Sequence, residues 1–558
     1  MLLWFACERN SRRAIIKLMQ HPTPDQQEVE WQFDALDVRP VGRWLENGAT
    51  DNALVRVAGE TREIADTYLD TEDWRIHQAG YALRIRRVKG KNGAEATMKL
   101  LASEGEAPGL RRRREISESL DNSEPGVFDE DSGPVGKRIS ALVGPKELRA
   151  LFEIRTQRRT YGLVVQGSEV GEVALDETTI PLENDAEPAY VKRVEVEVEP
   201  DALPRLEPFV ERMREACRLS PSTASKYEAG LFARDLAPPA PPEFEPTEVD
   251  GSLTAGEVAF RVLREQFAVF LAHEPGTRIG EDPEELHDMR VATRRMRAAM
   301  KVFEKQLPVR AHRFRDEFKW IAGALGEVRD LDVQLEQLDG WISSASPGDR
   351  EPLEALYVVL HERRKKARRS MLRRLNSRRY ARLVESFGAF LERGPSRRAQ
   401  ASRQPILAAA PGLVRKPYRK LRKLGDPLTE ESSGEEYHEL RKKSKRLRYA
   451  LEFLSDIYGD PANGLIKPLK ELQDVLGDHQ DAVVAVAHLR ELAVPGGRSK
   501  PKLSSETVFV MGGIAHRYEV RARELRSEFP GAYSKVRGKR WKKAKSAIEK
   551  ARPKGETR

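Results

Sequence analysis

The 558-residue sequence contains only two cysteines, Cys7 and Cys217. Two cysteines cannot form a disulfide framework, and this scarcity is typical of a reducing cytoplasm. No apolar run approaches the ~18 residues that a membrane-spanning helix needs. The first seven residues are apolar, but they lack a leading basic region and run directly into Glu8 and Arg9, which argues against a signal peptide. We therefore predict a cytoplasmic protein without a membrane span, in which residues 1–25 are either a disordered leader or the product of a mis-set start codon.

Several catalytic signatures are also missing. The sequence has no Gly-rich phosphate loop, no Cys-x-x-Cys zinc spacing and no convincing Ser/His/Asp set. These absences disfavour a P-loop nucleotidase, a zinc enzyme and a serine hydrolase.

Charge is unevenly distributed along the chain. Residues 1–250 carry 34 Lys and Arg against 46 Asp and Glu, whereas residues 251–558 carry 63 against 42. The first part is therefore net −12 and the second net +21. An acidic part suits divalent cations and a basic part suits an anionic polymer. Between them, residues 236–249 are Pro-rich and predict a semi-rigid linker that joins domains at 26–235 and 250–540.

The acidic part has the alternating pattern of β-strands. Residues 28–33 read Glu-Val-Glu-Trp-Gln-Phe, and residues 194–199 repeat Val-Glu three times. A period of two places the apolar residues on one face and the carboxylates on the other. Other strands carry cations at the polar positions, as at Arg84 and Arg86 or at Arg112 and Arg114. We predict an antiparallel β-barrel lined by carboxylates on some walls and by cations on others, which suits a metal–phosphate substrate.

The basic part is predicted to be helical and duplicated. A basic motif begins at His287 and again at His438, and a Leu-Gly pair begins at Leu325 and again at Leu476, both at an offset of 151 residues. Two motifs in one register indicate a repeat, with halves at about 250–400 and 401–540. Residues at offsets of 3, 7 and 10 lie within about 80° on a helix, so each basic motif forms a cationic stripe. The stripes predict a polyanion site formed by His287, Arg290, Arg294, Arg297, His438, Arg441, Lys445 and Arg448.

Three further interpretations concern this basic part. An aspartate, Asp330 or Asp481, follows each Leu-Gly pair, and we interpret it as a partner that orients the basic side chains. Residues 405–417 are interpreted as the connection between the two halves. The sequence from residue 535 is basic and poor in apolar residues, so a frayed tail is predicted, with residues 541–558 outside the domain.

Residues 26–232 resemble the CYTH domain, the fold of class IV adenylate cyclases, thiamine triphosphatases and bacterial inorganic triphosphatases, also called triphosphate tunnel metalloenzymes. The likeness depends on short motifs in a fixed order: Glu28-x-Glu30, 66–71, 80–86, 97–99, 112–115, 155–161, 175–177, Glu195-x-Glu197 and 225–227. Residues 250–540 resemble the CHAD domain, a duplicated helical module that binds inorganic polyphosphate. The resemblance implies an α+β multidomain protein, with an antiparallel β-tunnel followed by an all-α duplicated domain.

The resemblance also implies roles for individual residues. One or two Mg²⁺ or Mn²⁺ ions would be held by Glu28, Glu30, Asp176, Glu195 and Glu197. The triphosphate would be held by Arg84, Arg86, Lys99, Arg112, Arg114, Lys226 and either Arg158 or Arg159. The terminal phosphoanhydride would be hydrolysed through charge neutralisation and in-line positioning of water, with Glu28, Glu30 and residue 32 at the catalytic centre.

Position 32 departs from the family pattern. The opening signature of the family is Glu-x-Glu-x-Lys, and here the fifth residue is Gln32, which keeps a hydrogen-bond donor but loses the charge. Two functions therefore stay open: a metal-dependent hydrolase of inorganic triphosphate or a related triphosphate that recruits polyphosphate, and a polyphosphate-binding protein with impaired catalysis. Either would associate with polyphosphate granules. Adenylate cyclase activity also fits the fold, but the fused polyphosphate module favours a phosphate polymer. A nucleic-acid binder is disfavoured, because the basic residues lack interleaved aromatics.

Overall fold

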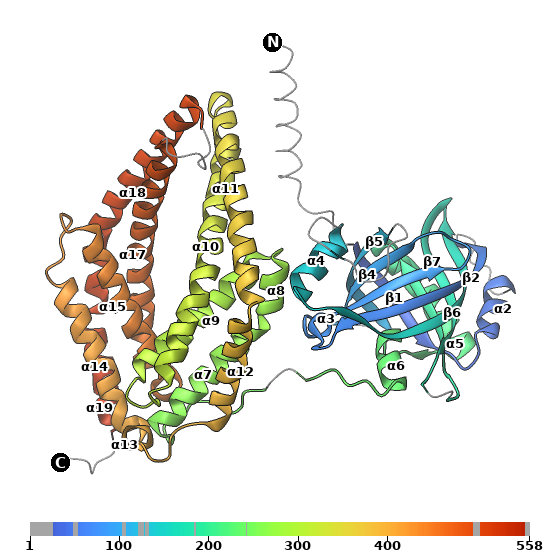
Figure 1. The fold of residues 1–558 in the computed structure, drawn as a ribbon, viewed down its shortest axis with the longest axis horizontal. Coiled ribbons are helices and arrows are strands. Elements are labelled where there is room, and N and C mark those ends of the chain that lie inside the picture. The colour runs from blue at the N-terminus through green and yellow to red at the C-terminus, as the bar shows by residue number, and fades with distance from the viewer. Residues whose placement is uncertain are drawn as a thin grey trace. The chain divides into compact units, whose positions relative to one another are not determined.

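The computed structural model describes residues 26–47, 54–102, 108–120, 128, 133–183, 186–240, 243–494 and 503–552. The predicted leader, residues 1–25, and the last residues of the predicted tail, 553–558, lie outside this part. The chain divides into two compact units, Met1–Pro241 and Pro242–Arg558, and the division falls within the predicted linker. Figure 1 labels helices and strands of both units.

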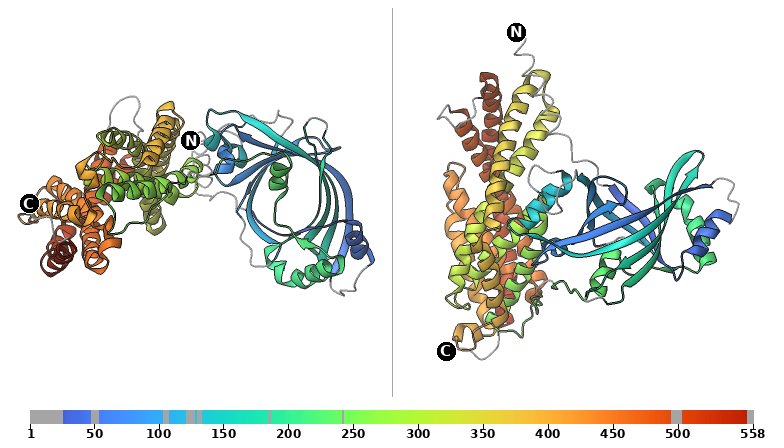
Figure 2. Two further views of the ribbon diagram at one scale, coloured as in Figure 1. Left: turned by 90° about the horizontal axis from the view of Figure 1, so that it is seen from below. Right: turned by 45° about the vertical axis from the view of Figure 1, so that its right-hand side comes forward.

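The first unit is a closed antiparallel β-barrel (Figure 2). The strand order is β5-β4-β3-β2-β6-β7-β8-β1, and β5 also pairs with β1, which closes the sheet. A two-residue strand, β9, pairs with β1. The strands are β1 Gln26–Asp34, β2 Leu54–Thr71, β3 Tyr81–Val88, β4 Ala94–Leu100, β5 Leu110–Leu120, β6 Leu148–Val165, β7 Ser168–Ile180, β8 Ala189–Val198 and β9 Ser220–Pro221. The predicted antiparallel barrel is confirmed.

Apolar residues of the barrel wall point outward and are covered by helices. On β1, Val29, Trp31 and Phe33 are buried, and on β8 Val194 and Val196 are buried beside them. Together with residues of α2 and α5 they form one apolar cluster, so the intervening polar residues face the barrel interior. The helices of this unit are α2 Arg39–Asn47, α3 Arg75–Gln78, α4 Pro134–Val143, the short 3₁₀ helix Pro200–Ala202, α5 Leu203–Cys217 and α6 Lys226–Ala233.

The second unit is all-α in its described residues, as predicted. Its first half comprises α7 Ala255–Ala272, α8 Glu274–Ile279, α9 Pro283–Val302, α10 Ala311–Ser344, α11 Pro347–Leu375 and α12 Arg378–Arg393. A short helix, α13 Gln400–Arg403, precedes the second half. That half comprises α14 Ile406–Gly425, α15 Gly434–Glu452, α16 Ser455–Tyr458, α17 Asp460–Ala493, α18 Ser505–Val536 and α19 Lys539–Lys550.

The two halves repeat the same helices. α9 and α15 carry the two basic motifs, α10 and α17 carry the two Leu-Gly pairs, and α7 precedes the first set as α14 precedes the second. The offset of 151 also aligns buried residues of α7 with buried residues of α14: Ala259 with Ala410, Leu263 with Val414, and Phe267 with Tyr418. The repeat found in the sequence is therefore also a structural repeat, in which equivalent residues of the two halves are buried.

Two sequence predictions in this unit are wrong. Residues 405–417 do not form a connection, because α14 begins at Ile406 and contains Pro411 and Pro417. A proline removes one helical hydrogen bond, but burial of Ile406, Val414 and their neighbours offsets that loss. The region from residue 535 is not a frayed tail either. α18 extends to Val536, and α19 buries Ala544 and Ile548 in the main core, since two apolar residues one helical turn apart suffice to dock a basic helix.

None of the helices that the structure describes is long and apolar enough to cross a membrane.

Candidate functional site

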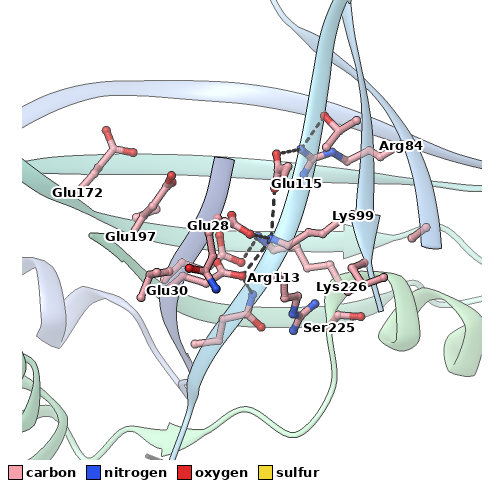
Figure 3. Close-up of a pocket in the computed structure, with 18 of the residues that line it drawn as sticks. Glu28, Glu30, Arg84, Lys99, Arg113, Glu115, Glu172, Glu197, Ser225 and Lys226 are labelled. Carbon is pink, nitrogen blue, oxygen red and sulfur yellow. Dashed lines mark hydrogen bonds and ion pairs between the residues drawn. The ribbon is translucent and has the colours of Figure 1, made fainter. Parts of the chain in front are cut away.

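The barrel interior contains a cavity of about 730 Å³ that is lined mainly by charged side chains. All eight strands of the closed sheet, β1 to β8, and the start of α6 contribute to it (Figure 3). Glu28, Glu30 and Gln32 all line this cavity, because alternate residues of β1 point to the same side. The charged residues within it form two groups of carboxylates and cations, with a pair of arginines beside them.

Lys99 of β4 lies among three carboxylates. Its Nζ is 3.0 Å from Glu30 Oε1 and 3.5 Å from Glu115 Oε2, and it also pairs with Glu28. Burial disfavours the charge of Lys99, but these carboxylates raise its pKa above the usual value. Burial also raises the pKa of Glu28 to about 8, since attraction to Lys99 is offset by repulsion from Glu30 and Glu115. Arg84 Nη2 also lies 3.8 Å from Glu115 Oε1, so Glu28 and Glu30 depend on Lys99 more than Glu115 does.

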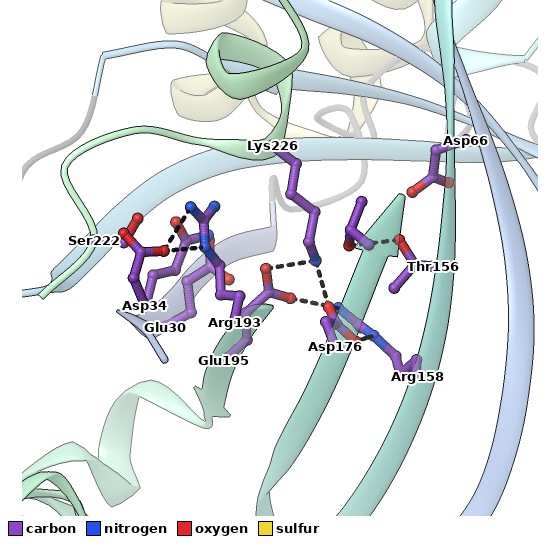
Figure 4. A network of polar contacts seen from close by, with 12 residues as sticks. Glu30, Asp34, Asp66, Thr156, Arg158, Asp176, Arg193, Glu195, Ser222 and Lys226 are labelled. Atoms are coloured by element: carbon purple, nitrogen blue, oxygen red, sulfur yellow. Dashed lines mark hydrogen bonds and ion pairs between the residues drawn. The ribbon is translucent and has the colours of Figure 1, made fainter. Parts of the chain in front are cut away.

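Arg158 and Lys226 hold a second pair of carboxylates (Figure 4). Arg158 donates from Nε to Asp176 Oδ1 at 2.8 Å and from Nη2 to Oδ2 at 2.6 Å, and Lys226 donates to Glu195 Oε1 at 2.8 Å. Each cation also contacts the other carboxylate. Burial would raise the pKa of Glu195, but Lys226 and Arg158 hold it well below its usual range. A capping box between Ser225 and the third residue of α6 fixes the start of the helix and so positions Lys226.

Asp66 of β2 orients the two predicted arginines of β3. Arg86 donates to both carboxylate oxygens of Asp66, at 2.8 Å and 2.9 Å, and Arg84 Nε lies 3.9 Å from Asp66 Oδ1. Burial would raise the pKa of Asp66, but the arginines hold it at about 2. The sequence motifs did not assign a role to Asp66. Asp66 is two residues from Tyr68, which lines the cavity, so both side chains lie on the inner face of β2.

Glutamates on three adjacent strands form a row in the cavity. Glu30 of β1 is the register partner of Glu197 of β8, which is in turn the partner of Glu172 of β7. Burial raises the pKa of Glu197, and repulsion from Glu30 and Glu115 adds to this shift. Within the described residues, no three Asp, Glu, His or Cys side chains converge closely enough to form a ready-made metal site.

The donor set nevertheless fits a hard divalent cation. Carboxylate oxygens are the ligands that Mg²⁺ and Mn²⁺ prefer, and crowded carboxylates with raised pKa values are relieved by a cation. Glu28, Glu30 and Glu197 would hold it. Asp176 and Glu195, also predicted as ligands, differ from these three because Arg158 and Lys226 already neutralise them.

The structure corrects the prediction for the arginines of β5. Arg113 is the register partner of Glu28 and lines the cavity, whereas Arg112 and Arg114 alternate with it and face the other side of the sheet. Arg113 is only 4% exposed, and its Nε and Nη2 have no hydrogen-bond partner among the described residues. Residues 111–114 are all arginine, so the period of two is concealed and no pattern shows which of them point inward.

The alternative between Arg158 and Arg159 is resolved in the same way. Arg158 points inward to Asp176, whereas Arg159 pairs with Glu46 and lies 5.2 Å from the ring centre of Tyr161 on the outside. Only Arg158 can contact a ligand in the barrel.

Gln32 lies beside the carboxylates of β1. Its side chain is 4% exposed, and its Nε2 donates to Glu30 Oε1 at 2.8 Å. The Oε1 atom of Gln32 has no hydrogen-bond partner among the described residues. A neutral amide therefore stands where the family has a second ammonium group next to these carboxylates.

In the helical unit, the two predicted cationic stripes meet between the halves. α9 packs on α15, and Arg290, Arg294, Arg441 and Lys445 lie close enough to perturb one another. Burial lowers the pKa of Lys445 to about 7, and repulsion from Arg441 and Arg294 contributes to this shift. Burial also lowers the pKa of Arg290. We call these four residues the interhelix cation cluster.

The remaining residues of the stripes take other positions. Burial and repulsion from Arg315 of α10, not from the cluster, lower the pKa of Arg297. Arg448 pairs with Glu452 at 3.3 Å and also contributes to the lowered pKa of Lys445, so it lies at the edge of the cluster. His287 and His438 are half-buried on α9 and α15.

The Leu-Gly-containing motif makes room for the arginines of the cluster. Arg290 Nη2 lies 3.5 Å from Asp330 Oδ1, and Arg441 Nη1 lies 4.0 Å from Asp481 Oδ1. A side chain at Gly477 would begin 3.0 Å from Arg441, because the guanidinium lies across the backbone of α17 at this point. The aspartates therefore act as predicted, as partners of the arginines, and the glycine allows the close approach.

Comparison with known families agrees with this geometry. The CYTH domain family matches residues 47–230, and the CHAD domain family matches residues 261–490. The chain belongs to the proteins that carry a CYTH domain followed by a CHAD domain.

Two uncharacterised proteins from two strains of Mycobacterium tuberculosis, MT2285 and Rv2226, are 25% identical to the chain over 322 residues. This match covers 57% of the chain and 60% of each relative, so it spans less than two thirds of their length.

Among solved structures, the CHAD domain from the plant Ricinus communis is 26% identical, with a TM-score of 0.45, over 53% of this chain and 97% of that one. The putative adenylyl cyclase HpAC1 from Hippeastrum, described as having a dominant triphosphatase activity, is 20% identical, with a TM-score of 0.29, over 37% of this chain and 96% of that one.

Proposed function

We propose that the CYTH domain hydrolyses a triphosphate in its barrel, with inorganic triphosphate as the preferred substrate. The observation that supports this most is the interior cavity of about 730 Å³, in which cations from five different elements converge with a row of glutamates. A compact, highly charged metal–phosphate complex matches such a lining, whereas a ligand with a large apolar part does not.

The cations of the barrel are positioned before the substrate arrives. Asp66 holds Arg86 in a bidentate pair, and Arg113 presents N–H groups that no described residue accepts. Arg158 and Lys226 are bound to Asp176 and Glu195, so they must exchange part of these contacts for phosphate oxygens. Glu28, Glu30 and Glu197 would hold a divalent cation, which would supply positive charge against the charge that develops on the phosphoanhydride. The side chains would bind and orient the substrate for in-line attack by water.

The experiment that tests this is phosphate release from tripolyphosphate with Mg²⁺ or Mn²⁺, measured beside ATP and thiamine triphosphate. We expect tripolyphosphate to be hydrolysed fastest, and Glu28→Gln with Glu30→Gln to lose the activity. The melting temperature of the same samples reports binding, because a ligand that binds only the folded state raises it. A thermal shift that needs both metal and tripolyphosphate, without phosphate release, contradicts the hydrolase and supports a barrel that binds without turnover. Gln32 is the observation that favours this second candidate.

We further propose that the CHAD domain binds inorganic polyphosphate through the interhelix cation cluster in the cytoplasm. The cluster brings four basic residues from two repeat halves together, and their mutual repulsion is relieved by a polyanion. No packing requirement explains why like charges should meet at this interface.

Binding of long-chain polyphosphate to the full chain tests this proposal. Arg290→Glu with Arg441→Glu should weaken binding by at least about tenfold, and the salt dependence should become shallower, since fewer counterions are released. Lys366→Glu with Arg373→Glu changes the net charge equally on exposed positions of α11 and is the matched control. Equal losses in both variants would show that general basicity, not the cluster, binds the polymer.

A further inference from the structure

A second strongly basic surface lies outside the interhelix cation cluster, on α14 and α19. These two helices pack against each other and together carry twelve Lys and Arg but a single acidic residue, Glu549 (Figure 1). Glu549 pairs with Arg415 at 2.7 Å and lies 3.9 Å from Lys545. Exposed cations that do not pair with Glu549 include Lys416, Arg419, Lys420 and Lys423 of α14 and Lys539, Arg540, Lys542, Lys543 and Lys550 of α19. We call this the α14–α19 surface.

The first half of the same domain provides an internal control. There α7 and α12 occupy the corresponding positions and also pack against each other, yet they carry six basic and four acidic residues. Lys416 of α14 corresponds to Glu265 of α7 at the offset of 151, and both are exposed. When α19 and α12 are aligned on buried residues, Ile548 with Leu391 and Ala544 with Phe387, Lys542 takes the place of Glu385. The fold therefore does not require these cations.

The two halves also differ in what covers these helices. In the first half, the ring of Phe244 in the connecting segment contacts Phe267 of α7 at a tilt, with ring centres 5.0 Å apart, and Val249 packs against the same core. In the second half, the corresponding residue Tyr418 stacks on Trp541 of α19, with ring centres 3.6 Å apart and planes 6° apart. This aromatic pair fills the contact between α14 and α19, and the cations beside it stay exposed. Among the residues that the structure describes, the connecting segment covers the first face and no corresponding segment covers the second.

The chemistry of the α14–α19 surface selects among polyanions. Its two aromatic rings are stacked on each other, so they offer little ring surface on which nucleic-acid bases can stack. The apolar residues of α19 are buried in the core, so this helix has no apolar face to insert into a membrane. What the surface offers is a dense array of point charges, which fits an anionic polymer without bases or apolar groups.

We propose that the α14–α19 surface is a second contact for inorganic polyphosphate, and that it makes the domain bind long chains in preference to short ones. The proposal rests on the proposed polyphosphate binding at the interhelix cation cluster. Because α14 packs on α15, which carries Arg441 and Lys445, both contacts belong to one half of the domain. A chain that reaches both is held by two linked contacts, whose combined affinity exceeds either alone, whereas a short chain can occupy only one.

The test compares long-chain and short-chain polyphosphate on the full chain at several salt concentrations. The variant is Lys416→Glu with Lys542→Glu, which introduces at each position the residue of the equivalent position in the other half. The control is Arg378→Glu with Arg382→Glu, which reverses two exposed cations of α12 and has the same net charge. We expect the α14–α19 variant to bind long chains roughly tenfold more weakly, to bind short chains as the unmodified protein does, and to show a salt slope shallower by about 2.

Each alternative result has a definite meaning. Equal losses for long and short chains, or an equal loss in the α12 control, would overturn the proposal, because they would indicate a general field effect. Single-stranded RNA of matched charge that binds more tightly than polyphosphate, and loses this affinity in the α14–α19 variant, would also overturn it in favour of a nucleic-acid surface. If the unmodified chain does not bind polyphosphate at all, the proposed function of the CHAD domain fails. If only Arg290→Glu with Arg441→Glu weakens binding, that function stands and the second contact is refuted.

Discussion

Replacement of Gln32 by lysine tests how much the barrel loses through the missing family cation. The three carboxylates Glu28, Glu30 and Glu115 share Lys99, and Gln32 contributes only a neutral donor to Glu30 at 2.8 Å. A lysine at this position would place a second ammonium group beside Glu30, since residue 32 already points into the cavity. We predict that Gln32→Lys raises the turnover of tripolyphosphate.

The magnitude follows from the cations that are already present. Loss of one positioned donor to a developing negative charge typically lowers kcat by about 10² to 10³. Arg113 lies opposite Glu28 with two nitrogen atoms that have no hydrogen-bond partner among the described residues, so it supplies part of the missing charge. We therefore expect a gain of about tenfold to hundredfold, which corresponds to about 1.4 to 2.7 kcal/mol of transition-state stabilisation.

Steady-state phosphate release gives kcat and KM separately for this comparison. The gain should appear mainly in kcat, because a cation that meets charge developing on the phosphoanhydride acts more strongly in the transition state than in the bound substrate. Gln157→Lys is the control: Gln157 is exposed on β6, where it is the register partner of Glu177 on the outside of the barrel. A protein without detectable hydrolysis before and after Gln32→Lys, while the melting temperature still responds to metal and tripolyphosphate, would refute the reasoning and favour the non-catalytic barrel.

Three further predictions concern residues that the structure places at the two sites. Arg113→Ala should lower kcat/KM for tripolyphosphate by about 10² or more, whereas the same change at Arg112, on the other side of β5, should have little effect in the same assay. Polyphosphate affinity should fall as pH rises through about 7, because Lys445 loses its charge there, and Lys445→Arg should remove this step in a titration of affinity against pH. Gly477→Ala should weaken polyphosphate binding more than Gly326→Ala, since the new methyl group would lie 3.0 Å from Arg441 but 3.6 Å from Arg290; equal effects would contradict the geometry.

The sequence predicted the barrel wherever each strand showed a clean period of two. Glu28, Glu30 and Glu197 alternate with buried Val, Trp or Phe, so their faces could be assigned without the structure. The prediction was wrong at Arg112 and Arg114, because four consecutive arginines carry no alternation. Only the register of β5 against β1, a contact between distant segments, identifies Arg113 as the residue inside.

In the helical unit, the sequence predicted the two cationic stripes but not that they converge at one helix interface. A helical period assigns Arg290 and Arg294 to one face of α9, yet it says nothing about which other helix that face approaches. The convergence with Arg441 and Lys445 depends on the packing of α9 on α15. The same limit explains the error at residues 405–417, where prolines suggested a break but tertiary burial keeps the helix intact.

The two units differ in how their buried cations are neutralised. In the barrel, Arg158 and Lys226 are each bound to buried carboxylates, so a ligand must compete for cations that are already neutralised. If a phosphate takes over Arg158 and Lys226, their carboxylates need a new cation, and only an anion bound together with a cation supplies one. The barrel therefore favours a metal–triphosphate complex. In the helical unit, by contrast, Lys445 is surrounded mainly by other cations, and burial and repulsion together lower its pKa to about 7. Any polyanion that reaches this cluster relieves the repulsion without a metal, so binding there should follow chain length and salt, whereas binding in the barrel should follow the divalent cation.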